Sequence, residues 1–271
     1  MSTMSSRALA CRFARLAVVA AATLTLAGCD LMMTDFSAQA TDQWSKTYTL
    51  AAGGRIEVVN VNGRIEVQPS AGDQVEVRAE KIGKGATDDA AKRALARITI
   101  EEQTGDNTIR LSTKVEGTGG VNMGGTEVKY YVRVPAGVSV KLDTTNGAIV
   151  ADNLAGDLSA ETVNGSIKGR GLAGEVSAAT INGAVDIEMS RLADGGVSIE
   201  TTNGGIDLTL PRDAAATVSA RLANGRINTS DLSIETTSEN TRRRLDGTLN
   251  GGGPRVRLET TNGAISIRGR S

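Results

Sequence analysis

The hexapeptide Thr144-Thr145-Asn146-Gly147-Ala148-Ile149 decides the fold, because variants of it recur along most of the chain. Its Asn-Gly pair lies between stretches of alternating apolar and polar residues at Asn62-Gly63, Asn146-Gly147, Asn164-Gly165, Asn182-Gly183, Asn203-Gly204, Asn224-Gly225 and Asn262-Gly263. From Asn146 to Asn224 the successive steps are 18, 18, 21 and 21 residues. Steps of that length are typical of one supersecondary unit that is copied and stacked. The sequence therefore predicts an all-β repeat protein.

The parity of the repeats predicts which side chains face inward. Apolar residues or threonine stand six, four and two places before the asparagine, as Val140, Leu142 and Thr144 do before Asn146. Because strand side chains alternate between two faces, each asparagine shares a face with these residues. The asparagines are therefore expected to point inward and to form a structural ladder, whose members are Asn146, Asn164, Asn182, Asn203, Asn224 and Asn262.

Two architectures can use this pattern. Asn-Gly between alternating runs is the strongest short-range signal for a type I′ β-hairpin, which would give an antiparallel meander. In a solenoid the chain instead turns a corner at Asn-Gly, and each coil lies parallel on the last at about 4.8 Å. A column of identical amides would then bond from coil to coil and satisfy buried asparagines. The same side chains recur at the inward and corner positions of the repeats, which favours the solenoid. The alternation of inward and outward residues fits both architectures, so the meander stays open.

The part of the chain before the tandem repeats is expected to contain one helix among its strands. Residues 87–96 begin with the capping residue Thr87, carry acids in the first turn and continue with alanines, which predicts a short surface helix. Its apolar face is mostly alanine, which favours packing on the sheet over binding of a partner. We expect one β-solenoid domain over residues 48–271, with an N-terminal β part at 48–135 and tandem coils at 136–271.

The first 28 residues have the composition of a targeting segment. Three arginines precede an uncharged apolar run of 13 residues, which is shorter than the roughly 20 residues of a membrane-spanning helix. The run ends in Leu26-Ala27-Gly28-Cys29, and here the chain resembles bacterial lipoproteins. The resemblance implies a signal peptide over residues 1–28, with an N-terminal signal helix, cleavage before Cys29 and lipid on that cysteine. Residues 29–47 would then form the lipidated end and a flexible tether.

Lipidation would place the protein in the bacterial cell envelope, facing the periplasm or the cell surface. Asp30 after the cysteine resembles an inner-membrane retention signal of enteric-type bacteria, and the choice between inner and outer membrane stays open. The membrane, reached through the lipid, is thus an expected partner. After loss of the signal peptide, 27 basic residues face 31 acidic residues, and only five aromatic residues remain. No nucleic-acid partner is expected from that composition.

Composition also argues against catalysis and cofactors. The chain has no histidine, and its only other cysteine, Cys11, lies in the signal peptide, so the usual general base and the usual soft metal ligands are missing. Coils of 18 to 21 residues leave little chain for the long loops of polysaccharide-active β-helix enzymes. Carboxylate pairs such as Asp186 and Glu188 exist, but no residue pattern marks a cleft around them. We expect no catalytic residues, no metal site and no cofactor.

Two features carry the expected binding surfaces. The rhythm fails between Asn224 and Asn262, where the gap of 38 residues contains Arg242, Arg243 and Arg244. These arginines are a candidate contact for an anion or partner, with solvated pairing to nearby acids as the alternative. The outward face carries a serine column with Lys141 at its start, followed by Ser159, Ser177, Ser198 and Ser219. A mixed column runs beside it, composed of Asp143, Glu161, Ala179, Glu200 and Arg221.

With the repeats established, the chain resembles the bacterial β-strand-repeat family called "putative adhesin", a domain of unknown function. Three segments carry the resemblance, namely residues 54–67, residues 144–149 and the closing residues 251–265. The resemblance covers the chain from about residue 48 and implies a right-handed parallel β-helix-like solenoid without an established activity. The word adhesin in the family name rests on analogy of fold.

The leading functional hypothesis is a non-enzymatic, lipid-anchored envelope protein that offers an adhesin-like interaction surface or scaffold. Its partner would be an unknown protein or an envelope polysaccharide. A polysaccharide-active β-helix enzyme is the alternative that a groove lined by several acids and a basic residue would support. A regulatory partner that senses envelope state beside a membrane protein is the other alternative.

Overall fold

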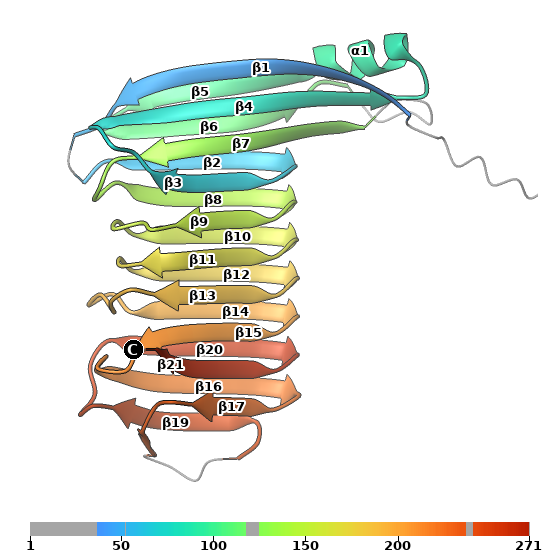
Figure 1. Cartoon of the computed structure of the whole chain (residues 1–271). Coiled ribbons are helices and arrows are strands. Elements are labelled where there is room, and N and C mark those ends of the chain that lie inside the picture. The colour runs from blue at the N-terminus through green and yellow to red at the C-terminus, as the bar shows by residue number, and fades with distance from the viewer. Residues whose placement is uncertain (1–36, 52, 118–124, 237–240, 271) are drawn as a thin grey trace, which may run out of the picture. The chain divides into compact units, whose positions relative to one another are not determined.

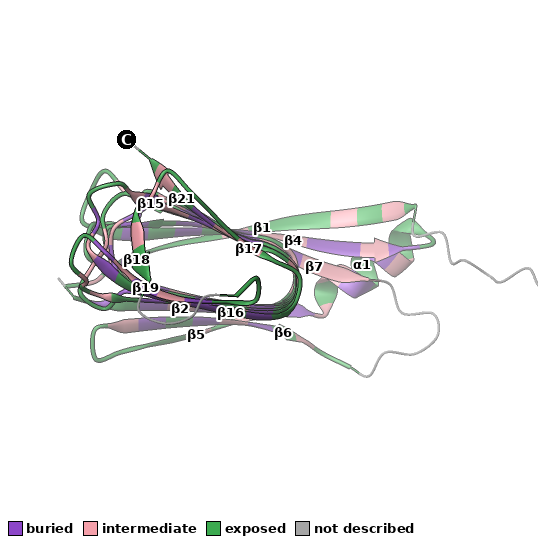
Figure 2. Cartoon of the chain, turned by 90° about the horizontal axis from the view of Figure 1, so that it is seen from below, coloured by how far each residue is buried: buried purple, intermediate pink, exposed green. Residues whose placement is uncertain are grey.

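Two β-sheets lie on opposite sides of a flattened coil and meet at a sharp corner (Figures 1 and 2). The computed structural model describes residues 37–51, 53–117, 125–236 and 241–270. The expected signal peptide and Cys29 lie outside the described residues. In the part described, no helix is long and apolar enough to cross a membrane.

Sheet A contains ten strands, and its spatial order differs from the chain order. From one edge to the other these are β1 (Ala38–Thr49), β4 (Gln74–Gly85), β7 (Thr126–Val134), β3 (Ile65–Pro69), β9 (Ile149–Asp152), β11 (Ile167–Leu172), β13 (Val185–Met189), β15 (Ile206–Pro211), β21 (Ile265–Arg270) and β17 (Ile227–Ser230).

Sheet B contains eleven strands that face sheet A. In spatial order these are β18 (Ile234–Thr236), β19 (Arg244–Leu249), β16 (Ala216–Asn224), β20 (Arg255–Asn262), β14 (Val197–Asn203), β12 (Val176–Asn182), β10 (Leu158–Asn164), β8 (Ser139–Asn146), β2 (Arg55–Asn62), β6 (Thr108–Val115) and β5 (Ile98–Gly105).

The repeats form a parallel solenoid, as the sequence predicts. Each repeat contributes one strand to sheet B, turns at Asn-Gly and contributes the next strand to sheet A. Strands of successive repeats pair parallel and in register, so that Asn146, Asn164 and Asn182 are neighbours. None of these asparagines has the positive φ that a type I′ hairpin requires. The meander alternative is therefore wrong.

The core lies between the sheets and consists of the apolar residues that alternate along each strand. Valine, isoleucine, leucine and alanine side chains from both sheets are buried there, as Leu142, Ile149 and Ile199 illustrate with no exposed surface. Outward residues of the same strands are polar or charged at most positions. The period-two alternation therefore determines which face of each strand is buried.

The prediction that the corner asparagines point inward is wrong, although the ladder exists. Asn182 donates from its side-chain amide to Asn164 at 2.9 Å and accepts from Asn203 at 2.9 Å, and all three side chains are exposed. The chain turns between the buried threonine and the asparagine, so the parity of the strand no longer holds at the corner. The amides therefore stack along the outside of the corner.

Threonine is the inward residue next to the corner in most coils, as the parity of the strand predicts. Thr180 is 5% exposed, and its hydroxyl donates to the carbonyl oxygen of Gly165 on the neighbouring coil at 3.0 Å. Thr162, Thr201 and Thr260 repeat this bond. These hydroxyls satisfy corner carbonyls that would otherwise lack a partner.

Two coils depart from this threonine pattern, because Leu222 stands at the inward position of β16 and an asparagine stands at that of β2. Asn60 occupies the inward position of β2, and its side-chain amide donates to the carbonyl of Gly63 at 3.2 Å and to that of Val128 at 2.8 Å. On the next coil, the buried hydroxyl of Thr144 has no hydrogen-bond partner in the described structure, unlike the hydroxyls of the later threonines.

The glycine of each Asn-Gly pair is required by close stacking. A Cβ atom on Gly183 would overlap the carbonyl oxygen of Gly165, and one on Gly165 would overlap that of Gly147. Gly183 does not have a positive φ, so backbone conformation is not the reason for glycine there. The corners repeat because neighbouring coils approach too closely for any side chain at this position.

Both terminal coils lie inside the stack. The first coil, β2 with β3, lies between β6 with β7 on one side and β8 with β9 on the other. The last coil, β20 with β21, lies between β14 with β15 and the earlier segment β16 with β17. Chain order and spatial order therefore differ at both ends of the solenoid (Figure 1).

The interrupted stretch between Asn224 and Asn262 forms the C-terminal cap. Strand β19 pairs antiparallel with β16 and with β18, and the chain then returns to insert β20 next to β14. The sequence predicts a coil that has lost its corner and gained a loop. The structure places a capping hairpin there instead.

The N-terminal end confirms the predicted helix and corrects the tether. Helix α1 (Asp88–Ala96) is capped by Thr87, whose hydroxyl accepts from the amide of Ala90, and Ala91 and Ala94 are buried. The flexible tether predicted over residues 29–47 is wrong from Ala38 onward, because β1 pairs antiparallel with β4 over its whole length. Pairing of twelve residues outweighs the lack of a clear period in that segment.

Candidate binding groove

The outer face of sheet B carries three parallel columns of side chains, one residue from each coil. The first column is Glu57, Lys141, Ser159, Ser177, Ser198, Arg257 and Ser219. The second is Val59, Asp143, Glu161, Ala179, Glu200, Glu259 and Arg221. The third stands directly before the corner asparagine of each coil, and consists of Val61, Thr145, Val163, Ile181, Thr202, Thr261 and Ala223.

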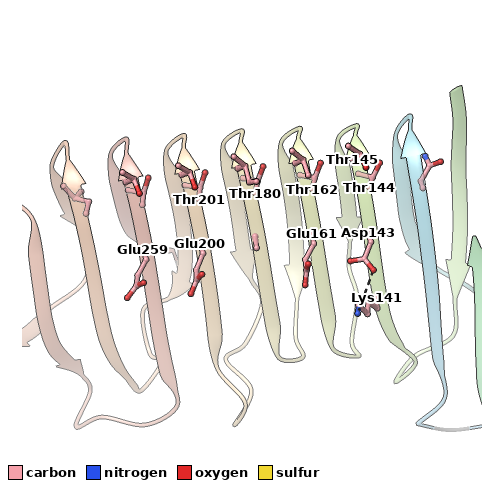
Figure 3. Close-up of a pocket in the computed structure, with 18 of the residues that line it drawn as sticks. Lys141, Asp143, Thr144, Thr145, Glu161, Thr162, Thr180, Glu200, Thr201 and Glu259 are labelled. Carbon is pink, nitrogen blue, oxygen red and sulfur yellow. Dashed lines mark ion pairs between the residues drawn. The ribbon is translucent and has the colours of Figure 1, made fainter. Parts of the chain in front are cut away.

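A groove of about 920 Å³ runs over the second and third columns, across the strands of sheet B. Figure 3 shows the carboxylates of Asp143, Glu161, Glu200 and Glu259 in one row, with the threonines near the corners. We call this surface the sheet B groove. Its lining comes from β2, β8, β10, β12, β14, β20 and β16.

Exposed apolar side chains gather at this groove. Among the described residues the exposed large hydrophobic side chains are Val61, Val163 and Ile181, at 39%, 37% and 48% exposure, and all three belong to the third column. Val163 and Ile181 lie on neighbouring strands and line the groove. Exposed apolar patches with polar rims mark interaction sites.

The acidic row is only partly neutralised. Arg257 lies 2.9 Å from Glu259 and 3.5 Å from Glu200, and Lys141 lies 3.9 Å from Asp143. Glu161 forms no ion pair with any residue of the described segments. The centre of the row therefore carries uncompensated negative charge.

Burial raises the pKa of the Asp143 carboxyl above its ordinary value, and the neighbouring carboxylates of Glu161 and Glu57 raise it further. Lys141 acts in the opposite direction and lowers it, but with less effect than burial.

The serine column is interrupted. Ser159, Ser177 and Ser198 are neighbours, but Arg257 separates Ser198 from Ser219 because the last coil is inserted there. The same insertion brings Glu259 into the acidic row between Glu200 and Arg221, a neighbour that the sequence order did not indicate. The exposed residues of the third column were also missed, although their place directly before the corner asparagine of each repeat marks them.

The three arginines of the cap lie away from this acidic centre, at the start of β19. Arg244 binds Asp246 at 2.6 Å, and Ser219 donates to the same carboxylate at 2.8 Å. These bonds, that of Arg244 first, lower the pKa of Asp246. Arg242 and Arg243 are exposed and form no ion pair with the described residues, and their contact with an anion or partner stays a prediction.

The described residues contain no group of three or more histidine, cysteine, aspartate or glutamate side chains placed to hold a metal ion. The acids of the groove lie in a row along the stack and do not converge on one point (Figure 3). The arrangement suits contact with an extended ligand that crosses several coils.

Comparison with known proteins identifies the repeat region. A family model described as Toastrack DUF4097 matches residues 136–268. A solved structure described as a "putative cell adhesion protein" from Clostridium sporogenes is similar to this chain at 14% identity, with 85% of this chain and 100% of that chain covered and a TM-score of 0.49.

A structure described as a "putative adhesin" from Bacteroides fragilis shows 13% identity, covering 84% of this chain and 97% of its own, with a TM-score of 0.33. Another of that description, from Parabacteroides distasonis, shows 12% identity over the same shares, with a TM-score of 0.28. No curated protein matches the chain.

Proposed function

We propose that this chain, whose residues 136–268 belong to the Toastrack DUF4097 family, is a non-enzymatic envelope protein that binds a partner through the sheet B groove. The observation that carries the proposal is the gathering of the exposed large apolar side chains in one column beside a row of acids. A solvated sheet face gains nothing from exposing Val163 and Ile181 side by side, whereas a binding surface does. The solenoid would act as a rigid, adhesin-like or scaffold surface.

The anchor is the second part of the proposal. The sequence Leu26-Ala27-Gly28-Cys29 supports lipid attachment at Cys29, and the first described strand begins at Ala38. Lipid on Cys29 would anchor the chain to the membrane on its N-terminal side. Labelling of cells with a palmitate analogue tests the anchor, and incorporation that persists after Cys29→Ser would contradict it.

Photo-cross-linking in cells tests the binding surface. A photoreactive amino acid at position 181 is expected to form adducts with an envelope component, because the Ile181 side chain is 48% exposed at the groove. The matched control carries the same amino acid at Ala155, an exposed residue in the turn before β10. Equal adduct patterns from both positions, or none from position 181, would contradict a partner at this groove.

One observation favours an enzyme acting on polysaccharide as a second candidate. Asp143 has a raised pKa and lies on the strand next to Glu161, and glycosidases use a carboxyl pair in which one member has a raised pKa. Release of reducing ends from envelope polysaccharide, abolished by Asp143→Asn, would support this candidate. Absence of such release while cross-links form from position 181 would leave the binding function.

A further inference from the structure

The acidic row has a gap at its centre. Glu161, Ala179 and Glu200 are neighbours on β10, β12 and β14, so two carboxylates flank one methyl group. Neighbouring strands are about 4.8 Å apart, so the backbones that carry the two glutamates lie about 10 Å from each other. A cationic group above Ala179 would be within ion-pair reach of both carboxylates.

The wall of the gap toward the corner is apolar. Ile181 follows Ala179 on the same face of β12, and Val163 stands at the corresponding place on β10. Both side chains are exposed, so an aliphatic chain that reached the gap could pack against them. Lysine and arginine combine an apolar stem with a charged end, and they bury the stem where apolar surface is offered.

The negative charge at the gap disfavours an anionic partner. Arg257 pairs with Glu200 and Glu259, but Glu161 has no ion pair among the described residues, and the gap is therefore negative. An anionic chain would be repelled there. Among the residues that the structure describes, no aromatic side chain lines the groove, so sugar rings would find no stacking surface there.

We propose that the gap at Ala179 receives a lysine or arginine side chain from an extended polypeptide that lies along the sheet B groove. The proposal rests on the function proposed above and names the chemistry of its partner. The cation would lie between Glu161 and Glu200, and apolar side chains of the same segment would contact Val163 and Ile181. Successive side chains of an extended segment point to opposite sides, so a segment of alternating lysine and valine that lies between the second and third columns turns its lysines toward the acids and its valines toward the apolar residues.

Binding of a short peptide that alternates lysine and valine, measured by fluorescence anisotropy on the full chain, tests the proposal. Ala179→Lys places a cation of the chain itself in the gap and is expected to weaken binding more than about tenfold, because a like charge then occupies the place proposed for the cation of the peptide. Glu161→Gln with Glu200→Gln is expected to weaken binding about threefold to tenfold, the range of two exposed ion pairs. Ala155→Lys, the matched control outside the groove, is expected to leave binding unchanged, and circular dichroism checks that each variant is folded.

Several results would overturn the proposal. These are equal binding of a peptide with glutamate in place of lysine, equal loss in Ala155→Lys and Ala179→Lys, and complete displacement by spermidine, which would indicate a small polyamine. Failure of the peptide to bind, while cross-links still form from position 181, would overturn the chemistry of the partner and leave the binding function. Failure of both would overturn the proposed function itself.

Discussion

The side-chain amide of Asn262 donates a hydrogen bond of 2.9 Å to the side-chain oxygen of Asn203, although 59 residues separate them in the chain. Asn224, which stands between them in sequence, donates instead to Asn262 at 2.8 Å. The last coil therefore lies inside the stack, and the outer face of sheet B is assembled from coils that are not consecutive. Glu259 joins the acidic row for this reason.

Loss of one amide from the ladder should cost little. Asn182→Ala removes two exposed side-chain hydrogen bonds and is expected to lower the free energy of unfolding by about 0.5 to 1.5 kcal/mol. Urea denaturation measures the change. Asn228→Ala on β17 serves as the control, since its exposed side chain has no hydrogen bond in the described structure. Equal losses in both variants would mean that the ladder contributes nothing.

A methyl group at a corner glycine should cost more. Gly183→Ala forces a Cβ atom into the carbonyl oxygen of Gly165, and a loss of about 1 to 3 kcal/mol in the free energy of unfolding is expected. Gly72→Ala is the matched control because its Cβ atom would meet open space, and a change within about 0.5 kcal/mol is expected. Thermal denaturation of both variants gives the comparison. Tolerance of Gly183→Ala would contradict the close stacking of the corners.

Alkaline pH should destabilise the N-terminal part through Tyr130. Burial raises the pKa of this side chain to about 12, and its hydrogen bond with Thr113 at 2.7 Å acts less strongly in the opposite direction. In the unfolded chain tyrosine titrates near pH 10, so between pH 10 and pH 12 the unfolded state loses its proton first. Stability contributed by the neutral group is complete below about pH 10 and falls as pH rises toward 12.

The difference between the pKa of Tyr130 in the folded chain and in the unfolded chain sets the size of this effect. The free energy of unfolding should fall by roughly 2 to 3 kcal/mol across that range. Tyr48 also has a raised pKa, chiefly from burial, so the comparison is best made in a Tyr48→Phe background. In that background Tyr130→Phe with Thr113→Val should flatten the decline, and an unchanged slope would show that Tyr130 does not control it.

The position of the last coil predicts an unusual mutational pattern. Ile265 and Ile227 hold equivalent places after Asn-Gly, but Ile265 is fully buried between two coils and Ile227 is half-buried on the edge strand β17. Ile265→Ala is expected to cost about 2 to 5 kcal/mol, and Ile227→Ala clearly less. Stacking in chain order would reverse the ranking, because Ile265 would then belong to the terminal coil. Chemical denaturation of the two variants decides between these orders.

Much of the fold could be predicted from the spacing and parity of the repeats. The β-solenoid, the inward apolar residues and the helix after Thr87 are local consequences of alternation, corner chemistry and capping, and the structure confirms them. The asparagine side chains were wrongly predicted to point inward. The prediction assumed that the alternation of the strand continues to the asparagine, but the chain turns before it.

The order of the coils could not be predicted. The repeats present nearly the same inward, corner and glycine residues, so each coil can stack on any other with similar contacts. Two long-range contacts decide the order. Strand β19 pairs antiparallel with β16 and β18, and the chain then returns and places β20 next to β14. Neither contact has a local signal in the sequence. The candidate site depended on this order, and therefore Glu259 could not be assigned to it from sequence.

Disulfide formation between paired cysteines tests the coil order, and with it the composition of the sheet B groove, most directly. In a background with Cys11→Ser and Cys29→Ser, the pair Ser198→Cys and Arg257→Cys lies on neighbouring strands, within the Cα separation that a disulfide allows. Ser198→Cys and Ser219→Cys lie two strands apart, at about 10 Å, which is too far. Rapid cross-linking of the first pair and none of the second, measured by mass spectrometry, is the predicted result. Cross-linking of the second pair without the first would contradict the inserted coil and the groove built on it.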